Sequence, residues 1–207
     1  MPDLSLERAA KSAGYARVCG IDEAGRGPWA GPVVAAAVCL DAVLNDDKLI
    51  GSLNDSKKLS AKRREALFDT LQARADVGVG VTSAQEIDEL NILKATFVAM
   101  GRALNDLATP PDFALVDGNR PPPLPCAHDV VVKGDSRSAS IAAASIIAKV
   151  TRDRLMAELA LTCPGYGWER NAGYGTAEHA AALDRLGVTE HHRRSFRPIR
   201  ERLSDSA

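Results

Sequence analysis

Two short apolar runs near the N-terminus are separated by a segment rich in turn-forming residues. Residues 17–21 and 32–40 have the composition of strands, and residues 25–31 between them read Gly-Arg-Gly-Pro-Trp-Ala-Gly. The second run is apolar at every position from 33 to 38, which is typical of a strand buried on both faces of a sheet. We therefore predict two adjacent strands joined through a functional loop.

The middle of the chain changes between helical and strand patterns. Residues 46–58 are polar and loop-like. Ser60 is a suitable N-cap for a helix from 61 to about 74, in which Leu67 and Leu71 fall on one face. In residues 77–81 valines alternate with small residues, which predicts a half-buried strand. Residues 83–108 are expected to be helical, in two pieces.

The second half of the chain continues this mixed order. Residues 113–116 form a strand pattern that ends at Asp117, the prolines of segment 121–125 exclude regular structure, and residues 129–132 form another strand pattern. The clearest helix runs from 136 to about 159, and its many alanine and serine residues permit close packing. Its predicted apolar face consists of Ile141, Ala144, Ala148 and Leu155.

The C-terminal part begins with a loop rich in glycine and tyrosine, residues 163–175. Thr176 is expected to cap a helix that ends at 186, and a helical tail follows from 188. The tail carries a cluster of arginines: Arg193, Arg194, Arg197, Arg200 and Arg202. Mixed strands and crossover helices in this order predict an α/β sheet with helices packed against it.

Composition limits the class of protein. With 207 residues, 45% hydrophobic and 26% charged, the chain suits one globular domain, or one domain with an appendage. Only 4% of the residues are aromatic, so the core must consist largely of Ala, Val, Leu and Ile. The formal net charge is −1. Overall charge therefore gives no argument for a nucleic-acid partner, which would need a local basic patch.

The cysteines and the apolar segments argue against several other classes. Cys19, Cys39, Cys126 and Cys163 are too far apart in sequence for a zinc-binding pair, and we interpret them as small buried hydrophobes. Residues 1–10 contain no apolar run of signal-peptide length, and no segment approaches the roughly 20 apolar residues of a membrane span. We expect a cytoplasmic protein without a membrane partner.

Acidic residues stand at strand ends and at a helix start. Asp22 and Glu23 follow the first strand, Asp117 ends a later one, and Asp135 precedes the long helix. These positions lie at the rim of a sheet, where sites in α/β folds form. Each aspartate by itself is more often a turn former or a cap. Neighbours on a regular strand point to opposite faces, so Asp22 and Glu23 share a site only if the strand ends or bulges there.

Several carboxylates brought together repel one another unless cations neutralise them. Oxygen-rich sites select hard cations such as Mg²⁺ or Mn²⁺. Two such ions, roughly 3.5–4 Å apart, can clamp the attacking and leaving oxygens of a phosphodiester. The acidic residues are therefore candidates for a site that holds two divalent cations and could act on a phosphodiester.

A set of motifs in a fixed order resembles bacterial ribonuclease HII. The matching segments cover about residues 16–195, and the ordered set is far more specific than any single motif. They are Gly20-Ile21-Asp22-Glu23-Ala24-Gly25-Arg26-Gly27-Pro28, Gly31-Pro32-Val33, Asn54-Asp55-Ser56-Lys57-Lys58-Leu59, Asp117-Gly118-Asn119, Lys133-Gly134-Asp135-Ser136, the helical segment 142–150 with Arg152-Asp153, and Gly173-Tyr174-Gly175-Thr176.

The resemblance implies a fold, a site and a cofactor. The expected fold is the ribonuclease H-like fold, a five-stranded mixed sheet flanked by helices with a C-terminal helical appendage. Residues 1–165 would form the catalytic domain, and 166–207 a loop and helical region packed on it. The four acidic residues of the family map onto Asp22, Glu23, Asp117 and Asp135, as metal ligands and catalytic residues. The usual cofactor is Mg²⁺, with Mn²⁺ as a substitute.

The activity implied is an endonuclease that hydrolyses the RNA strand of RNA–DNA hybrids. It would also cut 5′ of single ribonucleotides in duplex DNA, as in ribonucleotide excision repair and DNA replication, leaving 3′-hydroxyl and 5′-phosphate ends. Metal-free ribonucleases instead use the 2′-hydroxyl as nucleophile, and His128, His191 and His192 make no convincing pair for that chemistry. We expect a monomer, and the sequence leaves open whether a sliding clamp binds the tail.

The resemblance also assigns substrate contacts. The loop Gly25-Arg26-Gly27 would contact the 2′-hydroxyl, and Tyr174 would stack on the sugar at the RNA–DNA junction. Local sequence alone equally allows a plain turn and a packing tyrosine. Candidates for phosphate contact are Lys57, Lys133, Ser136, Lys149 and Arg152, of which Lys149 and Arg152 equally suit a solvated helix face. The arginines of the tail suit either duplex phosphates or a solvated terminal helix.

Three rival assignments remain at this stage. The nearest is another ribonuclease H-like nuclease, such as a resolvase or ribonuclease HIII, although the latter usually has an extra N-terminal domain and only about 15 residues precede the first strand here. A binding module without catalysis would have a broken acidic set. A nucleotide-binding protein would need a third glycine, or Lys-Ser or Lys-Thr, at motif spacing after residues 25–27.

Overall fold

A mixed five-stranded sheet forms the centre of the computed structural model, which describes residues 1–204. The strands are β1 (Val18–Ala24), β2 (Val33–Cys39), β3 (Asp76–Thr82), β4 (Phe113–Asp117) and β5 (Ala127–Val131). Their order across the sheet is β3-β2-β1-β4-β5. Strand β2 pairs antiparallel with both β1 and β3, whereas β1, β4 and β5 are parallel. The predicted mixed sheet, and the adjacent pairing of the first two strands, are confirmed.

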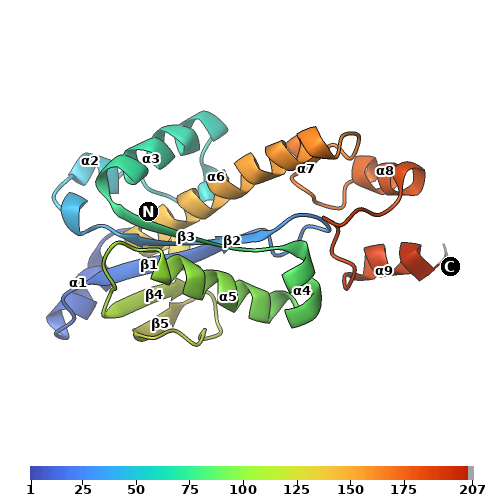
Figure 1. The fold of residues 1–207 in the computed structure, drawn as a ribbon. Coiled ribbons are helices and arrows are strands. Elements are labelled where there is room, and N and C mark those ends of the chain that lie inside the picture. Colours follow the sequence, from blue (N-terminus) through green and yellow to red (C-terminus); the bar gives the residue numbers. More distant parts are fainter. Residues whose placement is uncertain (205–207) are drawn as a thin grey trace.

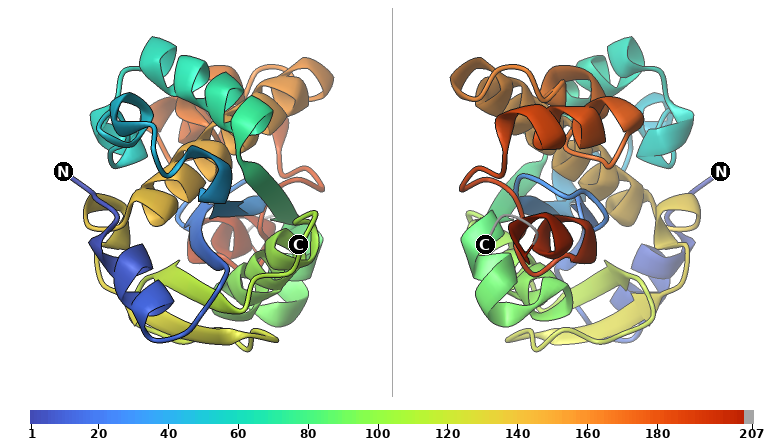
Figure 2. Two further views of the ribbon diagram at one scale, coloured as in Figure 1. Left: turned by 90° about the vertical axis from the view of Figure 1, so that its left-hand side faces the viewer. Right: turned by 90° about the vertical axis from the view of Figure 1, so that its right-hand side faces the viewer.

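Helices cover both faces of this sheet. They are α1 (Ser5–Ser12), α2 (Asp47–Ile50), α3 (Ala61–Arg74), α4 (Ala84–Leu90), α5 (Ile92–Asn105), α6 (Ala139–Thr162), α7 (Trp168–Asn171), α8 (Ala177–Leu186) and α9 (Arg197–Ser204). Helices α3 and α6 lie on one face, and α4 and α5 on the other (Figure 1). Helices α8 and α9 gather at one end of the molecule (Figure 2, right).

Two helices begin directly after the N-cap residues predicted for them, Ser60 and Thr176. The hydroxyl of Ser60 accepts the N–H of Arg63, and that of Thr176 accepts the N–H of His179. Residues 83–108 form two helices as predicted, because Asn91, with φ of 69°, interrupts them and caps the second one. The short helices α1, α2 and α7 were not predicted, since each is too short to show a clear period.

The long helix α6 differs from its prediction in two ways. It starts at Ala139 with Ser138 as its N-cap, because residues 134–136 form a separate 3₁₀ turn. Its first half is buried on all sides rather than along one face, and Met156, not Leu155, is the buried residue further along. A fully buried helix has no polar face, so the apolar-face pattern did not describe it.

Close contact between α6 and β1 depends on Gly20. A Cβ at this position would lie 2.1 Å from the backbone carbon of Ser140. The alanine-rich start of α6 therefore rests directly on the strand that carries Asp22 and Glu23. This contact sets the distance at which α6 packs against β1.

Strand β3 is half-buried, as predicted, but its fully buried side is the glycine side. Val77 and Val79 are only partly covered, whereas Gly78 and Gly80 are buried against α5. Added Cβ atoms at the two glycines would lie about 2 Å from carbonyl oxygens of α5, those of Ala103 and Ala99 respectively. The glycines let helix and strand backbones touch.

The C-terminal region packs on the rest through its own apolar cluster. Tyr166, Trp168, Leu183 and Ile199 join Met156 of α6 in this cluster. Ala30 belongs to it too, so the loop between β1 and β2 lies against the C-terminal region. The division into a catalytic part, 1–165, and an appendage, 166–207, stays a prediction, and residues 205–207 lie outside the described residues.

Two further expectations concern cysteines and membranes. All four cysteines are free; Cys19 and Cys39 are buried as predicted, whereas Cys126 and Cys163 are only partly buried. Within residues 1–204, no helix is long and apolar enough to cross a membrane.

We predict that Gly80→Ala destabilises the protein by about 1–3 kcal/mol, because its methyl group would overlap the backbone of α5. Gly101→Ala is the matched control, since a Cβ there meets nothing within 4 Å, and a helical Gly→Ala change should stabilise by up to about 1 kcal/mol. Urea denaturation measures both. Equal effects of the two substitutions would contradict the proposed contact between β3 and α5.

Candidate active site

Asp22 and Asp117 lie side by side at the carboxyl ends of two parallel strands. The register of β1 and β4 pairs Ile21 with Val116, so the next residue of each strand is one of the two aspartates. Adjacent strands are separated by about 4.8 Å, which brings the two carboxylates to the same rim of the sheet. The fold therefore unites two acidic residues that are far apart in the chain.

Glu23 reaches the same place without a bulge in β1. The pairing of β1 with β2 continues regularly through Asp22, Glu23 and Ala24. Strand β1 runs on to Ala24, whereas its neighbour β4 ends at Asp117. Side chains from both faces of β1 therefore reach the space beyond the end of β4. The expectation that the strand must end or bulge was wrong, because the neighbouring strand ends instead.

A cavity of about 340 Å³ occupies this end of the sheet. It is lined by all four predicted acidic residues and by most of the residues predicted to contact the substrate. Its lining residues are Asp22, Glu23, Ala24, Gly25, Arg26, Gly27, Ser56, Lys57, Asp117, Asp135, Ser145, Lys149, Arg152 and Tyr174.

The carboxylates in this cavity are short of positive partners. Asp22 is 6% exposed, and burial, followed by the charges of Glu23 and Asp117, raises its pKa well above the ordinary value. Burial also raises the pKa of Glu23, although the guanidinium of Arg26, 3.2 Å from Oε1 of Glu23, opposes this. The site therefore stores electrostatic repulsion that a bound cation would relieve.

Asp135 is placed by a turn that Asp117 holds. Oδ1 of Asp117 accepts the backbone N–H of Gly134 at 2.6 Å, at the start of the 3₁₀ turn Gly134–Ser136. Burial, then the charges of Asp55 and Asp117, raises the pKa of Asp135. Of the two local roles open to Asp135, turn former and cap, the structure shows the turn, since Ser138 caps α6.

The buried Glu7 of α1 fixes the start of α6 from the other side. Its Oε1 accepts hydrogen bonds from the hydroxyls of Ser138 and Ser140 and from the N–H of Ser140, at 2.6–2.8 Å. The first dozen residues, which lie outside the segments that resemble the family, thus support the segment next to Asp135.

The donor chemistry of the cavity fits divalent metal ions. Its acidic ligands are all carboxylate oxygens, which bind hard cations such as Mg²⁺ and Mn²⁺. Burial, and beyond it the charge of neighbouring carboxylates, raises the pKa of Asp22, Glu23 and Asp135, so a bound cation would stabilise their charged forms. As the side chains stand, no three His, Cys, Asp or Glu residues within 1–204 are grouped closely enough to hold a metal. The carboxylates would have to draw together around an ion.

The predicted phosphate contacts divide into two groups. Lys57 and Lys149 line the cavity, and Lys149 is held by Asp153 at 2.6 Å. Lys133 and Ser136 do not line it. Lys133 is exposed in a left-handed turn, and its carbonyl accepts the hydroxyl of Ser136 at 2.8 Å.

Arg152 has neither of the two roles predicted for it, a phosphate contact or a residue on a solvated helix face. It is 1% exposed, so it does not lie on a solvated helix face. Its guanidinium donates to the carbonyls of Ala30, Pro32 and Ala172 at 2.9–3.2 Å. These bonds commit the side chain to backbone rather than to phosphate, although it borders the cavity.

Two serines of the cavity were missed in the sequence. The hydroxyls of Ser145 of α6 and Ser56 are hydrogen-bonded to each other at 2.9 Å, and the hydroxyl of Ser145 beside Asp22 lowers the pKa of that carboxyl against the larger effect of burial. Both serines lie within the motifs that carry the family resemblance. Ser145 was hidden because it sits among alanines, where serine reads as a small packing residue.

Tyr174 lies half-exposed beside the loop between β1 and β2. Its ring is 3.5 Å from where a Cβ of Gly27 would be. The carbonyl of Tyr174 accepts a hydrogen bond from Nδ1 of His179 at 3.0 Å. The tyrosine is thus part of the cavity wall, and its backbone is fixed by a histidine from α8.

His179 is in turn held by His192, a residue that sequence reasoning set aside. Nδ1 of His192 accepts the backbone N–H of Thr189 at 3.0 Å, so its proton lies on Nε2. That Nε2 donates to Nε2 of His179 at 3.1 Å, which leaves the proton of His179 on Nδ1, facing Tyr174. The chain of bonds requires both imidazoles to be neutral.

Comparison with known proteins adds a family to this geometry. A family model for ribonuclease HII matches residues 19–199. The ribonuclease HII of Rhodospirillum rubrum is 64% identical over 209 aligned positions, covering 100% of this chain and 94% of that protein. Ribonuclease H2 from Pyrococcus horikoshii has a similar fold, with a TM-score of 0.78 at 29% identity, covering 92% of this chain and 98% of that one.

A second solved structure is that of the PCNA:RNase HII complex from Archaeoglobus fulgidus. The similarity has a TM-score of 0.70 at 27% identity and covers 88% of this chain and 96% of that one.

We predict that acid destabilises the protein through His192. Burial and then the nearby His179 lower the pKa of His192 from its ordinary 6.5 to about 3. Below about pH 6.5 the unfolded chain therefore binds a proton that the folded protein does not, and stability falls as pH drops toward 3. The expected loss between pH 7 and pH 5 is about 2 kcal/mol from this residue.

Chemical denaturation at several pH values measures this loss. His192→Phe should be less stable at pH 7, because the N–H of Thr189 loses its acceptor, yet its stability should fall less between pH 7 and pH 5. If the stability of wild type and of His192→Phe falls equally between pH 7 and pH 5, His192 does not cause the loss.

Proposed function

The chain belongs to the ribonuclease HII family, and from that premise we propose that it hydrolyses the RNA strand of RNA–DNA hybrids and cuts 5′ of single ribonucleotides embedded in duplex DNA. The observation that carries this proposal is the cavity in which Asp22, Glu23, Asp117 and Asp135 meet at the carboxyl ends of β1 and β4. The matching family model is that of ribonuclease HII, which favours this assignment over ribonuclease HIII or a resolvase.

The four acidic residues would hold two divalent ions, Mg²⁺ or Mn²⁺. The chemistry that such ions would supply there is activation of the attacking water and stabilisation of the departing 3′ oxygen of the phosphodiester. The backbone would support these ligands, since strand pairing brings Asp22 and Asp117 side by side and Asp117 binds the Gly134 turn that carries Asp135. Products would carry 3′-hydroxyl and 5′-phosphate ends.

Other residues of the cavity would position the substrate. Lys57 and Lys149 offer positive charge to phosphates beside the acidic cluster, although the whole chain has a net charge of −1. The loop of Gly25, Arg26 and Gly27 would face the 2′-hydroxyl, and the exposed ring of Tyr174 would stack on the sugar next to it.

The remaining expectations follow from this activity. A substrate in chromosomal DNA would imply that the enzyme works in the cytoplasm. It would act there in ribonucleotide excision repair and replication, and we expect it to be a monomer. A sliding clamp would have to meet the C-terminal tail, of which residues 197–204 form α9 and residues 205–207 lie outside the described residues.

A nicking assay tests the proposal directly. With Mg²⁺ or Mn²⁺, the protein should cut a DNA duplex holding one ribonucleotide on the 5′ side of that residue and leave the matched all-DNA duplex intact. Asp22→Asn and Asp117→Asn should each lower the rate on the order of a thousandfold, because a ligand for the metal is lost. Both should fold, since an asparagine oxygen still accepts the N–H of Glu23 or Gly134. An inactive wild type with both metals would reject the assignment.

Tyr174→Ala should cut the single-ribonucleotide duplex about 10- to 100-fold more slowly, the scale expected when one stacking contact is removed. Tyr174→Phe is the matched control, because it keeps the ring, and it should remain close to wild type. Steady-state kinetics on the same duplex compares the three proteins. If the alanine variant is as fast as wild type, Tyr174 only packs against the loop.

A further inference from the structure

Arg193, in the segment before α9, is buried against the loop between β1 and β2. Its side chain is 0% exposed. Its guanidinium donates to four carbonyl oxygens of that loop: Gly25 at 2.6 Å, Arg26 at 3.0 Å, Gly31 at 3.0 Å and Pro32 at 3.1 Å. One side chain from the C-terminal region thus binds both ends of the loop.

This arrangement is costly for a cation, and no carboxylate of residues 1–204 forms an ion pair with Arg193. Burial, followed by the charge of Arg152, lowers the pKa of Arg193 to about 9. The carbonyl dipoles of the loop are its counter-charge, so the loop and the arginine stabilise each other.

Two of these hydrogen bonds also fix the direction of the N–H group of the residue that follows. In a trans peptide the C=O of one residue and the N–H of the next point in opposite directions, and the described chain has no cis peptide. Because the carbonyl of Gly25 points to Arg193, the N–H of Arg26 points away from it. The carbonyl of Arg26 fixes the N–H of Gly27 in the same way.

These two N–H groups belong to residues that border the cavity. Neither donates to another residue within 1–204. Arg26 and Gly27 both line the cavity that holds the acidic residues, and the ring of Tyr174 lies beside Gly27. Two free donors with fixed direction therefore stand next to the surface proposed to hold a ribose.

We propose that Arg193 is a positioning residue for ribonucleotide selection: by binding the carbonyls of Gly25 and Arg26, it aims the N–H groups of Arg26 and Gly27 at the 2′-hydroxyl of the substrate. This inference rests on the proposed function. It gives the C-terminal region a role in specificity, since the arginine reaches the loop from outside the sheet.

Arg152 holds the same loop in a different way. It shares Pro32 with Arg193, but its other bonds go to Ala30 and Ala172. None of its bonds orients the peptides between residues 25 and 27, so loss of Arg193 should not be replaced by Arg152.

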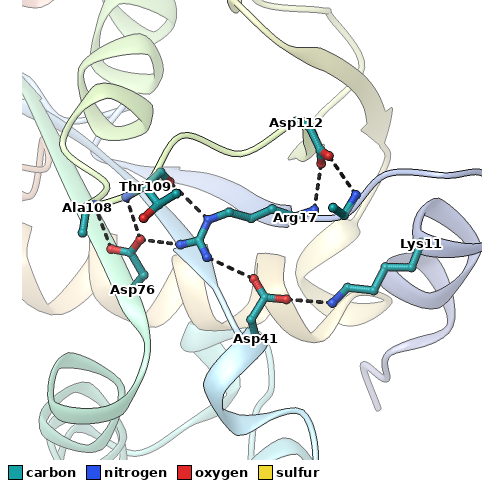
Figure 3. A network of polar contacts seen from close by, with 8 residues as sticks. Lys11, Arg17, Asp41, Asp76, Ala108, Thr109 and Asp112 are labelled. Carbon is teal, nitrogen blue, oxygen red and sulfur yellow. Dashed lines mark hydrogen bonds and ion pairs between the residues drawn. The ribbon is translucent and has the colours of Figure 1, made fainter.

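The test uses Arg193→Lys, which keeps the charge but cannot reach four carbonyls from one ammonium group. Arg17→Lys is the control for general loss of stability. Arg17 binds Asp41, Asp76 and the carbonyl of Thr109 (Figure 3). It directly precedes β1, so it lies at the opposite end of that strand from Asp22. Melting temperatures show how far each variant is destabilised.

Hydrogen–deuterium exchange of the full chain measures the loop itself. Peptides covering residues 24–32 should exchange faster in Arg193→Lys than in wild type, whereas Arg17→Lys should leave them unchanged. This readout does not require cutting. Unchanged exchange in Arg193→Lys would overturn the positioning role.

Selectivity for the ribonucleotide is measured as binding affinity. Arg193→Lys and Arg17→Lys are each combined with Asp117→Asn, which is expected to prevent cutting. The probes are a DNA duplex with one ribonucleotide and the matched all-DNA duplex. Arg193→Lys should reduce the preference for the ribonucleotide on the order of tenfold to a hundredfold, the effect of misplacing a contact by about 1 Å. Arg17→Lys should keep the preference.

The outcomes separate this inference from the proposed function. A faster-exchanging loop with unchanged preference would remove Arg193 from ribonucleotide selection. A wild-type protein that fails the nicking assay would reject the proposed function, and the exchange experiment would still decide whether Arg193 orders the loop.

Discussion

Repulsion between carboxylates that are partly or fully buried at one end of the sheet is the constraint on which this structure depends. Asp22, Glu23, Asp117 and Asp135 border one cavity, and burial and mutual charge raise the pKa of three of them. Such a group stays together only on a rigid frame. Parallel pairing of β1 with β4 and the close approach of α6 at Gly20 supply that frame. The acidic site is therefore held chiefly by backbone contacts, to which the ion pair of Glu23 with Arg26 at 3.2 Å is added.

The same principle applies to the loop that borders the site. Arg152 and Arg193 are both buried and both bind backbone carbonyls, so the loop between β1 and β2 is fixed from two directions. Tyr174 is fixed separately, through His179 and His192. Each of these supports buries polar or charged groups. That cost is acceptable only where the hydrogen bonds are complete, which leaves little freedom for the backbone around the cavity.

Charge at the site differs from charge over the whole molecule. The net charge of −1 gives no sign of a polyanionic partner. Lys57, Lys149 and Arg26 nevertheless stand around the acidic cluster, so positive groups are placed locally where a phosphate backbone would pass. In the proposed function, divalent ions held by these residues would complete this balance by neutralising the carboxylates.

The sequence by itself determined the strands, the capped helices and the acidic residues of the site. These follow from local signals: an apolar run for β2, the hydroxyl caps of Ser60 and Thr176, and the ordered motifs that contain Asp22, Asp117 and Asp135. Tertiary structure alone decided how Glu23 joins Asp22, because that depends on where a neighbouring strand ends. It also decided that Arg152 and Arg193 bind carbonyls inside the protein. Their partners are backbone atoms of a distant loop, and backbone atoms are the same at every position of a sequence.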